Sequence, residues 1–327
     1  RGAIVTEKSL FQQNVIAIIW DFDKTLSPHY MQKPIFDEYG IDEGQFWREV
    51  NQLPDYYARS GVQVPRDTCY LGHLLSYVKA GRMPGLTNAK LRELGGKIEF
   101  FPGIPEIFDR LEAIVCEPQF ASAGVCLEHY VVSTGLAELI RGSAISSWIA
   151  GIWASEFIEC SAEPGQDLSG TPSSGPISQI AGFLDNTTKT RALFEINKGV
   201  NKESTITVNK RIAEDDRRVP FKNMIYIADG PSDIPSFSVV RKHGGHAFAV
   251  FARGSASQFE QANALLEDGR VDNVGPADYR EHGQTDMWLQ LQVRRLTERI
   301  VEERQRALES RVGREPVHAE ALPESIP

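Results

Sequence analysis

Asp21 and Asp23 flank a single phenylalanine in a D-x-D-x-T string that directly follows the apolar residues 15–20. Two carboxylates spaced i, i+2 at the end of a strand face the same side. Together with a backbone carbonyl from the turn that follows, they offer the hard oxygen ligands that Mg²⁺ takes. The pair therefore predicts a magnesium site at the end of a buried strand.

A second acidic pair follows another apolar run. Residues 224–228 are continuously apolar, and Asp229 and Asp233 come directly after them, with Gly230 permitting a tight backbone path. A turn in which an aspartate caps the backbone would have the same sequence. If the two acidic pairs converge, however, four carboxylates repel one another strongly unless a cation lies among them. Convergence would make bound Mg²⁺ the expected cofactor.

Hydroxyl and amino groups supply the remaining candidates. The apolar residues 130–132 are followed by Ser133, Thr134 and Gly135. At the start of a helix, such residues can bind a phosphoryl group through hydroxyl and backbone N–H groups, although N-capping is the structural alternative. Lys189 would offset the charge of the acids, and Arg191 and Lys198 compete for that role.

The elements that must position these residues alternate along the chain. Apolar runs typical of buried strands occur at 15–20, 130–132, 224–228 and 247–251. Helical patterns occur at 105–114, 136–149 and 190–197. This alternation predicts an α/β fold with a doubly wound, Rossmann-like parallel sheet. The carboxyl ends of parallel strands meet at one edge of such a sheet, so the polar residues are expected to converge there.

Two segments depart from this alternation. Residues 27–96 are helical in character and rich in aromatics, and we interpret them as a helical cap inserted into a core of residues 1–26 and 97–283. Residues 284–327 are interpreted as a long C-terminal helix, over 284–312, followed by a disordered tail. Within the core, residues 161–176 are rich in Ser, Gly and Pro, which predicts a loop or a loose hairpin.

One face of the C-terminal helix is apolar. The residues at helical spacing on that face are Leu289, Val293, Leu296 and Ile300. Such a stripe predicts a helix that docks on its own core. The alternative is a dimerisation helix, so a homodimer is a second possibility.

In this order, the motifs resemble those of the haloacid dehalogenase (HAD) superfamily of phosphohydrolases. Residues 188–199 and 227–236 are similar to its phosphoserine-phosphatase-like branch, and residues 101–105 resemble the return of the chain from cap to core. The resemblance covers residues 15–251. It implies an enzyme that hydrolyses a small phosphomonoester with the help of Mg²⁺.

The resemblance also implies roles for the four acids. Asp21 would attack phosphorus and form an aspartyl-phosphate. Asp23 would protonate the leaving oxygen and then activate water for the second step. Mg²⁺ would be held by Asp21, the backbone carbonyl of Asp23, and Asp229, with Asp233 supporting the metal directly or through water.

The remaining motif residues would handle the phosphoryl group. By the same resemblance, Ser133 and the backbone of Thr134 and Gly135 would hold the phosphoryl oxygens. Lys189 would orient Asp21 and offset its charge. Phosphoryl transfer depends mainly on positioning and charge stabilisation, and these groups supply both.

The segment after the first motif bears on the substrate. Serine-specific members of the branch usually carry an acid there to hold the substrate amine, whereas residues 27–32 contain none. This disfavours phosphoserine as the substrate. His29 and Tyr30 are the first expected substrate contacts. Further candidates in the cap are Trp47, Tyr56, Tyr57 and Arg59.

Composition narrows the class of protein. The 327 residues are 41% hydrophobic and 24% charged, with a formal net charge of -9, which argues against binding to nucleic acid. The apolar run 15–20 is too short to span a membrane, and no signal-peptide pattern precedes it. The four cysteines form no C-x-x-C pair. We therefore expect reduced thiols, a cytoplasmic location and a small phosphorylated substrate as the partner.

Three other functions share parts of this pattern. Dehalogenase, phosphonatase or phosphotransferase chemistry occurs in the same superfamily, although Asp23 argues against a dehalogenase, which has no leaving oxygen to protonate. A receiver-type phosphoacceptor domain uses similar acids in a different chain order. A non-catalytic binding protein on the same fold would bind Mg²⁺ without turnover.

Overall fold

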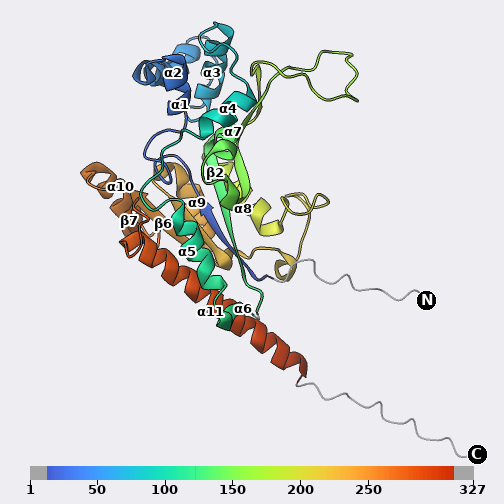
Figure 1. The fold of residues 1–327 in the computed structure, drawn as a ribbon, viewed down its shortest axis with the longest axis vertical. Helices are drawn as coiled ribbons and strands as arrows, with labels where there is room; N and C mark the ends of the chain where they lie inside the picture. The colour runs from blue at the N-terminus through green and yellow to red at the C-terminus, as the bar shows by residue number, and fades with distance from the viewer. Residues whose placement is uncertain (1–12, 122, 313–327) are drawn as a thin grey trace, which may run out of the picture.

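The computed structural model describes residues 13–121 and 123–312 and is built around one seven-stranded sheet (Figure 1). The strands are β1 (Val15–Trp20), β2 (Cys126–Leu136), β3 (Ile149–Ile158), β4 (Gln179–Gly182), β5 (Met224–Ala228), β6 (His246–Phe251) and β7 (Asn273–Pro276). Their order across the sheet is β4-β3-β2-β1-β5-β6-β7. Only the pairing of β3 with β4 is antiparallel, so the predicted doubly wound parallel sheet is confirmed.

Eleven α-helices are described. They are α1 (Lys33–Tyr39), α2 (Glu43–Ala58), α3 (Cys69–Lys79), α4 (Asn88–Gly95), α5 (Glu106–Val115), α6 (Pro118–Ala121), α7 (Ala137–Gly142), α8 (Lys189–Lys198), α9 (Ile234–Lys242), α10 (Ala256–Glu267) and α11 (Gln284–Val312). The predicted strands 15–20 and 224–228 match β1 and β5 in full, and the predicted runs 130–132 and 247–251 lie inside β2 and β6.

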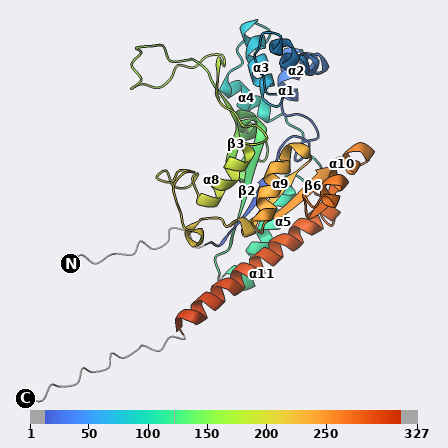
Figure 2. The same cartoon turned by 180° about the vertical axis from the view of Figure 1, so that it is seen from behind.

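Strand β1 shows how the sheet divides the core into two layers. Ile16, Ile18 and Trp20 point to the face that α5 and α11 cover. Val15, Ala17 and Ile19 belong to the cluster on the other face, with residues of α8, α9 and α10. Figure 2 shows α8 and α9 lying over that second face. Every residue of β1 is buried, because helices cover both faces.

The segment interpreted as a cap contains α1 to α4 and lies beyond one end of the sheet (Figure 1). Helix α4 packs closely against α7 of the sheet layer. Two glycines permit this approach: a Cβ on Gly142 would overlap the carbonyl of Arg92, and a Cβ on Gly95 would overlap that of Leu139. Arg92 also pairs with Glu138 at 2.8 Å. The helical segment is therefore anchored to the sheet layer through α4.

The helix predicted over residues 136–149 is wrong beyond its first turns. Helix α7 ends at Gly142, a short 3₁₀ turn covers Ser146–Trp148, and β3 begins at Ile149. The chain leaves the helix at Ser143, whose backbone is extended, directly after the close contact of Gly142 with α4. The predicted loose hairpin at 161–176 is confirmed as the connection between β3 and β4, and it projects from the body of the molecule (Figure 1).

The C-terminal helix has the predicted bounds, and its apolar residues Leu289, Val293, Leu296 and Ile300 are buried in the core. The predicted docking of this helix on the chain's own core is therefore confirmed. The tail expected after Gly313 lies outside the described residues.

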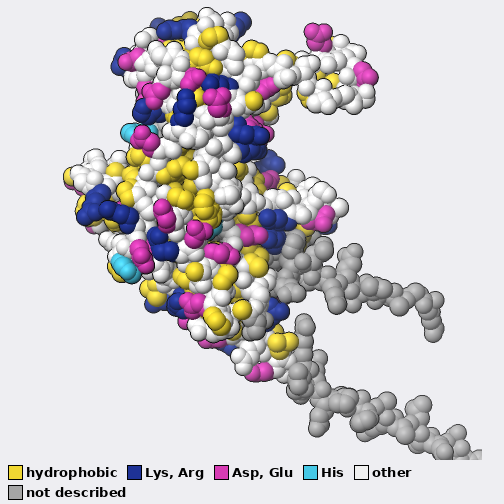
Figure 3. All heavy atoms as spheres, viewed as in Figure 1, with side chains coloured by type: hydrophobic (Ala, Val, Ile, Leu, Met, Phe, Trp, Pro, Cys, Tyr) yellow, Lys and Arg dark blue, Asp and Glu magenta, His cyan; other side chains and the backbone are white. Residues whose placement is uncertain are grey.

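Among the described helices, none combines the length and the apolar character needed to cross a bilayer. On the face shown in Figure 3, acidic and basic side chains are interspersed over the sheet layer and the helical segment.

Candidate active site

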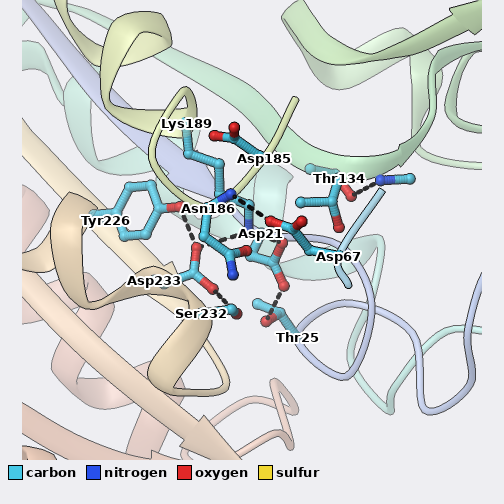
Figure 4. Close-up of polar contacts among 12 residues, drawn as sticks. Asp21, Thr25, Asp67, Thr134, Asp185, Asn186, Lys189, Tyr226, Ser232 and Asp233 are labelled. Atoms are coloured by element: carbon cyan, nitrogen blue, oxygen red, sulfur yellow. Dashed lines mark hydrogen bonds and ion pairs between the residues drawn. The ribbon is translucent and has the colours of Figure 1, made fainter. Parts of the chain in front are cut away.

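Asp21 lies at the carboxyl end of the central strand β1, where the chain leaves the sheet. Its side chain is buried, and its two oxygens have separate partners (Figure 4). Oδ1 accepts a hydrogen bond from Nζ of Lys189 at 2.8 Å, and Oδ2 accepts one from the Thr25 hydroxyl at 3.2 Å. Burial raises the pKa of Asp21 to about 6, and Lys189 opposes that rise.

Lys189 is the first residue of α8 and is only 2% exposed. Its ammonium group bridges Asp21 and Asp233, with 2.8 Å to each carboxylate. The start of α8 is held in place by Asp185, whose Oδ1 accepts from the backbone N of Thr187 at 2.9 Å and of Thr188 at 2.6 Å. The two carboxylates hold the pKa of Lys189 well above its usual value, so this lysine carries a positive charge.

Asp233 is fully buried and accepts three hydrogen bonds. Its Oδ1 accepts from Lys189 and from the Tyr226 hydroxyl at 2.5 Å, and its Oδ2 accepts from the Ser232 hydroxyl at 2.7 Å. Tyr226 reaches Asp233 from inside β5, on the α8 side of the sheet. The carboxylate is therefore fixed by three side chains from three segments of the chain.

Three carboxylates converge at this edge. Oxygens of Asp21, Asp229 and Asp233 all lie within 4.8 Å of one another. Lys189 is the cation that bridges two of them, so two negative charges remain when all three are ionised. Burial, followed by the charges of Asp21 and Asp233, raises the pKa of Asp229 to about 8. A set of hard oxygen donors with surplus negative charge fits a divalent cation such as Mg²⁺.

Asp23 is not one of the three carboxylates in this group. Its Oδ1 accepts from the backbone N of Met31 at 2.8 Å, at the entry to the helical segment. Burial and the charge of Asp21 raise the pKa of Asp23 to about 7. Its carboxyl group is thus partly protonated near neutral pH. A group that first gives and then takes a proton needs a pKa in this range.

The Ser133–Gly135 segment differs from the prediction in its local structure. These residues extend the end of β2, and α7 begins only at Ala137. The Ser133 hydroxyl accepts from the backbone N of Gly135 at 3.0 Å, and no described residue accepts from its own O–H, which can therefore donate to a ligand. The carbonyl of Thr134 accepts from the Tyr70 hydroxyl of α3 at 2.8 Å. The strand end and the helical segment are therefore hydrogen-bonded to each other.

A pocket of about 390 Å³ opens beside Asp23 and Thr134. The helical segment supplies its other lining residues, which are Tyr30, Gln32, Trp47, Val50, Asn51, Arg66, Asp67 and Tyr70. Asp67 also crosses to the loop before Lys189, where its Oδ2 accepts from the backbone N of Asn186 at 3.2 Å (Figure 4). The pocket thus lies between the helical segment and the two residues that follow or end the central strands, Asp23 and Thr134.

The two predicted substrate contacts share one small cavity, which Lys33 and Lys97 also line. Tyr30 lines the pocket beside Asp23 as well, whereas His29 does not. Nε2 of His29 is 3.7 Å from Glu99. Of the further candidates, Trp47 lines the pocket, whereas Tyr56 and Tyr57 are exposed side chains outside it.

One curated protein is clearly related to this chain. A protein from Borreliella burgdorferi is 35% identical over 284 residues, which covers 85% of this chain and 96% of the relative. This chain belongs to that protein's family. The relative is described only as an uncharacterized protein, so it brings no activity with it. No family model matches the chain.

Solved structures with lower similarity include hydrolases. A HAD family hydrolase from Salmonella enterica serovar Typhi matches with a TM-score of 0.47 and 13% identity, over 82% of this chain and 68% of that one. A phosphoserine phosphatase in a phospho-aspartyl intermediate analogue matches with a TM-score of 0.42 and 18% identity, over 79% of this chain and 92% of that one.

Several residues of the site were not predicted from the amino-acid sequence. Gln32, Asn51, Arg66 and Asp67 lie in the helical segment, and only the fold brings them to the pocket. Tyr226 lies within the apolar run of a buried strand, and nothing in the sequence indicates that its hydroxyl bonds Asp233. Thr25 is part of the first motif, and its position four residues after Asp21 was the available signal.

Proposed function

We propose that this protein is a Mg²⁺-dependent phosphohydrolase of the HAD type, and that it hydrolyses a small phosphomonoester through an aspartyl-phosphate on Asp21. The observation that carries the proposal is the cluster in which Asp21 and Asp229, directly after β1 and β5, meet Asp233 and the buried Lys189 at the start of α8. The order of the motifs along the chain resembles that superfamily and supports the same conclusion.

The donor set supports a divalent cation held by Asp21, Asp229 and Asp233, with the backbone carbonyl of Asp23 as a further oxygen. When bound, the cation neutralises the surplus charge of the cluster and polarises a phosphoryl oxygen. Asp21 and Asp233 each keep one oxygen on Lys189. The protein's own residues therefore fix both carboxylates before any ligand arrives.

In the first step, a carboxylate oxygen of Asp21 attacks phosphorus. The bond from that oxygen to phosphorus forms while the bond from phosphorus to the leaving oxygen breaks, and Asp23 gives its proton to the leaving oxygen. Lys189 and the Ser133 hydroxyl offset the negative charge of the transferring group. Covalent catalysis divides one difficult displacement into two easier ones.

In the second step, water attacks the phosphorus of the aspartyl-phosphate. The ionised Asp23 takes a proton from that water, the bond from phosphorus to the Asp21 oxygen breaks, and inorganic phosphate leaves. Asp21 is then ionised and Asp23 protonated, as at the start. Atoms and charges are balanced over the cycle, with water as the only co-reactant.

The helical segment is proposed to act as a cap over these steps. Tyr70 bonds the Thr134 carbonyl, and Asp67 bonds the backbone of Asn186, so the segment contacts the site from two sides. A closed cap limits the access of bulk water and strengthens the electrostatic interactions within the site.

Release of inorganic phosphate from a generic aryl phosphate tests the proposal. We expect release with Mg²⁺, none with EDTA, and none from Asp21→Asn, which removes the nucleophile at nearly constant volume. Asp268→Asn, at an exposed aspartate after α10, is the matched control and should behave as wild type. Phosphate release by Asp21→Asn at the wild-type rate would refute the assignment.

A further inference from the structure

The pocket beside Asp23 has one aromatic wall. The rings of Tyr30 and Trp47 lie 5.0 Å apart between centroids, and those of Trp47 and Tyr70 lie 5.8 Å apart. Tyr30 remains 44% exposed, although such a side chain could have been packed into the core. An aromatic surface of this kind binds the apolar face of a ring-shaped ligand.

A polar side chain also lines this pocket: Gln32, which is 2% exposed. The Tyr70 hydroxyl, which donates to the Thr134 carbonyl, lines this pocket too. Oε1 of Gln32 is buried and has no hydrogen-bond partner among the residues that the structure describes. A buried acceptor without a donor is a position where a ligand O–H or N–H would bind.

The charged residues at the pocket are already partnered. Arg66 lies 3.4 Å from Asp55, and Asp67 accepts from the backbone of Asn186. Their charges also offset each other, so the cap side of the pocket offers no net charge to a charged leaving group. Planar amide, carboxylate and guanidinium groups do offer many directed donors and acceptors. Asn51, on the exposed side of α2, adds one more amide.

The size of the pocket also selects among ligands. A volume of about 390 Å³ falls in the range of pockets that enclose a ring-sized ligand. The serine moiety of phosphoserine would leave most of this space unfilled. Of the two charged residues that the helical segment places there, Arg66 pairs with Asp55 and Asp67 accepts from the backbone N of Asn186.

From these observations we propose that the leaving group is an uncharged, polyhydroxylated ring, so that the substrate is a sugar phosphate. The ring would lie against Trp47 and Tyr30, one hydroxyl would donate to Oε1 of Gln32, and others would bond Asn51 and Asp67. This inference rests on the proposed phosphohydrolase function and adds the class of substrate to it.

The first test compares substrates and requires no variant. Phosphate release with Mg²⁺ is measured for glucose and ribose phosphates, for phosphoserine, and for hexyl phosphate, which has a similar carbon count without hydroxyls. A site built to hydrogen-bond hydroxyls rejects analogues that lack them. We expect kcat/KM for one of the sugar phosphates to exceed that for hexyl phosphate and phosphoserine by at least about a hundredfold.

The second test uses Gln32→Leu, with Gln45→Leu as the matched control. Gln45 is a glutamine of the same helical segment that bonds Glu49 and lies outside the pocket lining. We expect Gln32→Leu to lower the ratio of kcat/KM for the sugar phosphate to that for the aryl phosphate by about tenfold. Gln45→Leu should leave that ratio unchanged.

The outcomes separate the two proposals. Hydrolysis of hexyl phosphate or phosphoserine as fast as the sugar phosphates would overturn the inference and leave the phosphohydrolase function intact. An absence of Mg²⁺-dependent hydrolysis of every ester would overturn the function. In that case, calorimetric titration of Asp21→Asn tests whether the pocket binds a sugar ring. Tighter binding of glucose phosphate than of hexyl phosphate would support the inference, and equal or absent binding would overturn it.

Discussion

Among the described residues, the Tyr226 hydroxyl hydrogen-bonds one member of the acidic cluster, Asp233. This hydroxyl donates to the same oxygen that accepts from Lys189, and Lys189 in turn holds Asp21. Tyr226 is therefore a positioning residue for the proposed metal ligand and nucleophile. Residues that orient metal ligands typically change metal affinity or activity about 10–100-fold when they are mutated.

Tyr226→Phe is expected to raise the Mg²⁺ concentration needed for half-maximal activity by about tenfold, because Asp233 loses one of its three fixed donors. Calorimetric titration with Mg²⁺ checks the affinity independently of activity. Tyr130→Phe is the matched control, since Tyr130 is equally buried but bonds Glu128. Equal effects of the two substitutions would contradict a positioning role for Tyr226.

His129 shows the opposite behaviour, since it is buried without charge. It lies in β2, where its Nδ1 accepts from Nε1 of Trp20 at 3.2 Å. Burial lowers its pKa to about 3. In the unfolded chain its pKa is ordinary, near 6.5, so below that pH the unfolded state binds a proton that the folded state does not. Proton binding by His129 in the unfolded state therefore leaves the unfolding free energy unaffected well above pH 6.5 and lowers it progressively as pH falls toward 3.

We therefore expect wild type to lose about 2 kcal/mol more unfolding free energy than His129→Gln between pH 7 and pH 5. Gln retains an acceptor for Trp20 but does not titrate. The raised pKa values of Asp21, Asp23 and Asp229 act in the opposite direction, but they are common to both proteins and cancel in the comparison. Urea unfolding at both pH values measures the difference, and parallel pH profiles would contradict the account.

Helix α11 carries two kinds of leucine, and the distinction is visible only in the structure. Leu296 is 2% exposed in the core, whereas Leu308 is 56% exposed. Leu296→Ala is expected to lower the unfolding free energy by about 2–5 kcal/mol, because it removes packing and leaves a cavity. Leu308→Ala should change it by less than about 0.5 kcal/mol.

The same two substitutions distinguish a helix that docks on its own core from a helix that forms a dimer. If the buried face of α11 serves its own core, Leu296→Ala lowers stability and leaves the mass in solution unchanged. Sedimentation beside chemical unfolding measures both. A change in oligomeric mass with unchanged stability would contradict the docking seen for α11.

Among the strands and helices, those buried on both faces were predicted from the sequence, and those that are short or exposed were not. Strands β1 and β5 are apolar throughout because helices cover both faces, and continuous apolar runs identify them. Strand β7 has four residues, including a glycine and a proline, and β4 is exposed along its length. Their sequences carry no such pattern. The early end of α7 at Gly142 was not predicted either, and the contact of that residue with α4 involves a segment far away in the sequence.

The candidate site followed the same rule. Residues at strand ends, such as Asp21 and Asp229, were predictable because parallel strands end at one edge of the sheet. Residues of the helical segment, such as Gln32 and Asp67, reach the pocket only through the packing of that segment on the sheet layer. Local sequence contains no information about that packing angle.

At the scale of the whole molecule, the acidic cluster links metal binding to stability. A ligand that binds only the folded state adds about 2.7 kcal/mol at a hundredfold excess over its Kd. We expect Mg²⁺ to raise the unfolding free energy of wild type in this way, and Asp229→Asn, which loses one ligand, to gain far less at the same concentration. Denaturant unfolding with and without Mg²⁺ measures both, and an equal gain in the two proteins would contradict the metal site.

The covalent step on Asp21 is tested most directly by trapping the intermediate. The enzyme is mixed with a substrate in excess, quenched in acid during turnover, and treated with borohydride, which reduces an acyl phosphate to an alcohol. Mass spectrometry of the peptide that contains residue 21 then reads the outcome. The account predicts homoserine in place of Asp21, only when substrate and Mg²⁺ are both present. Sustained turnover with Asp21 unreduced, or with reduction at another carboxylate, would contradict it.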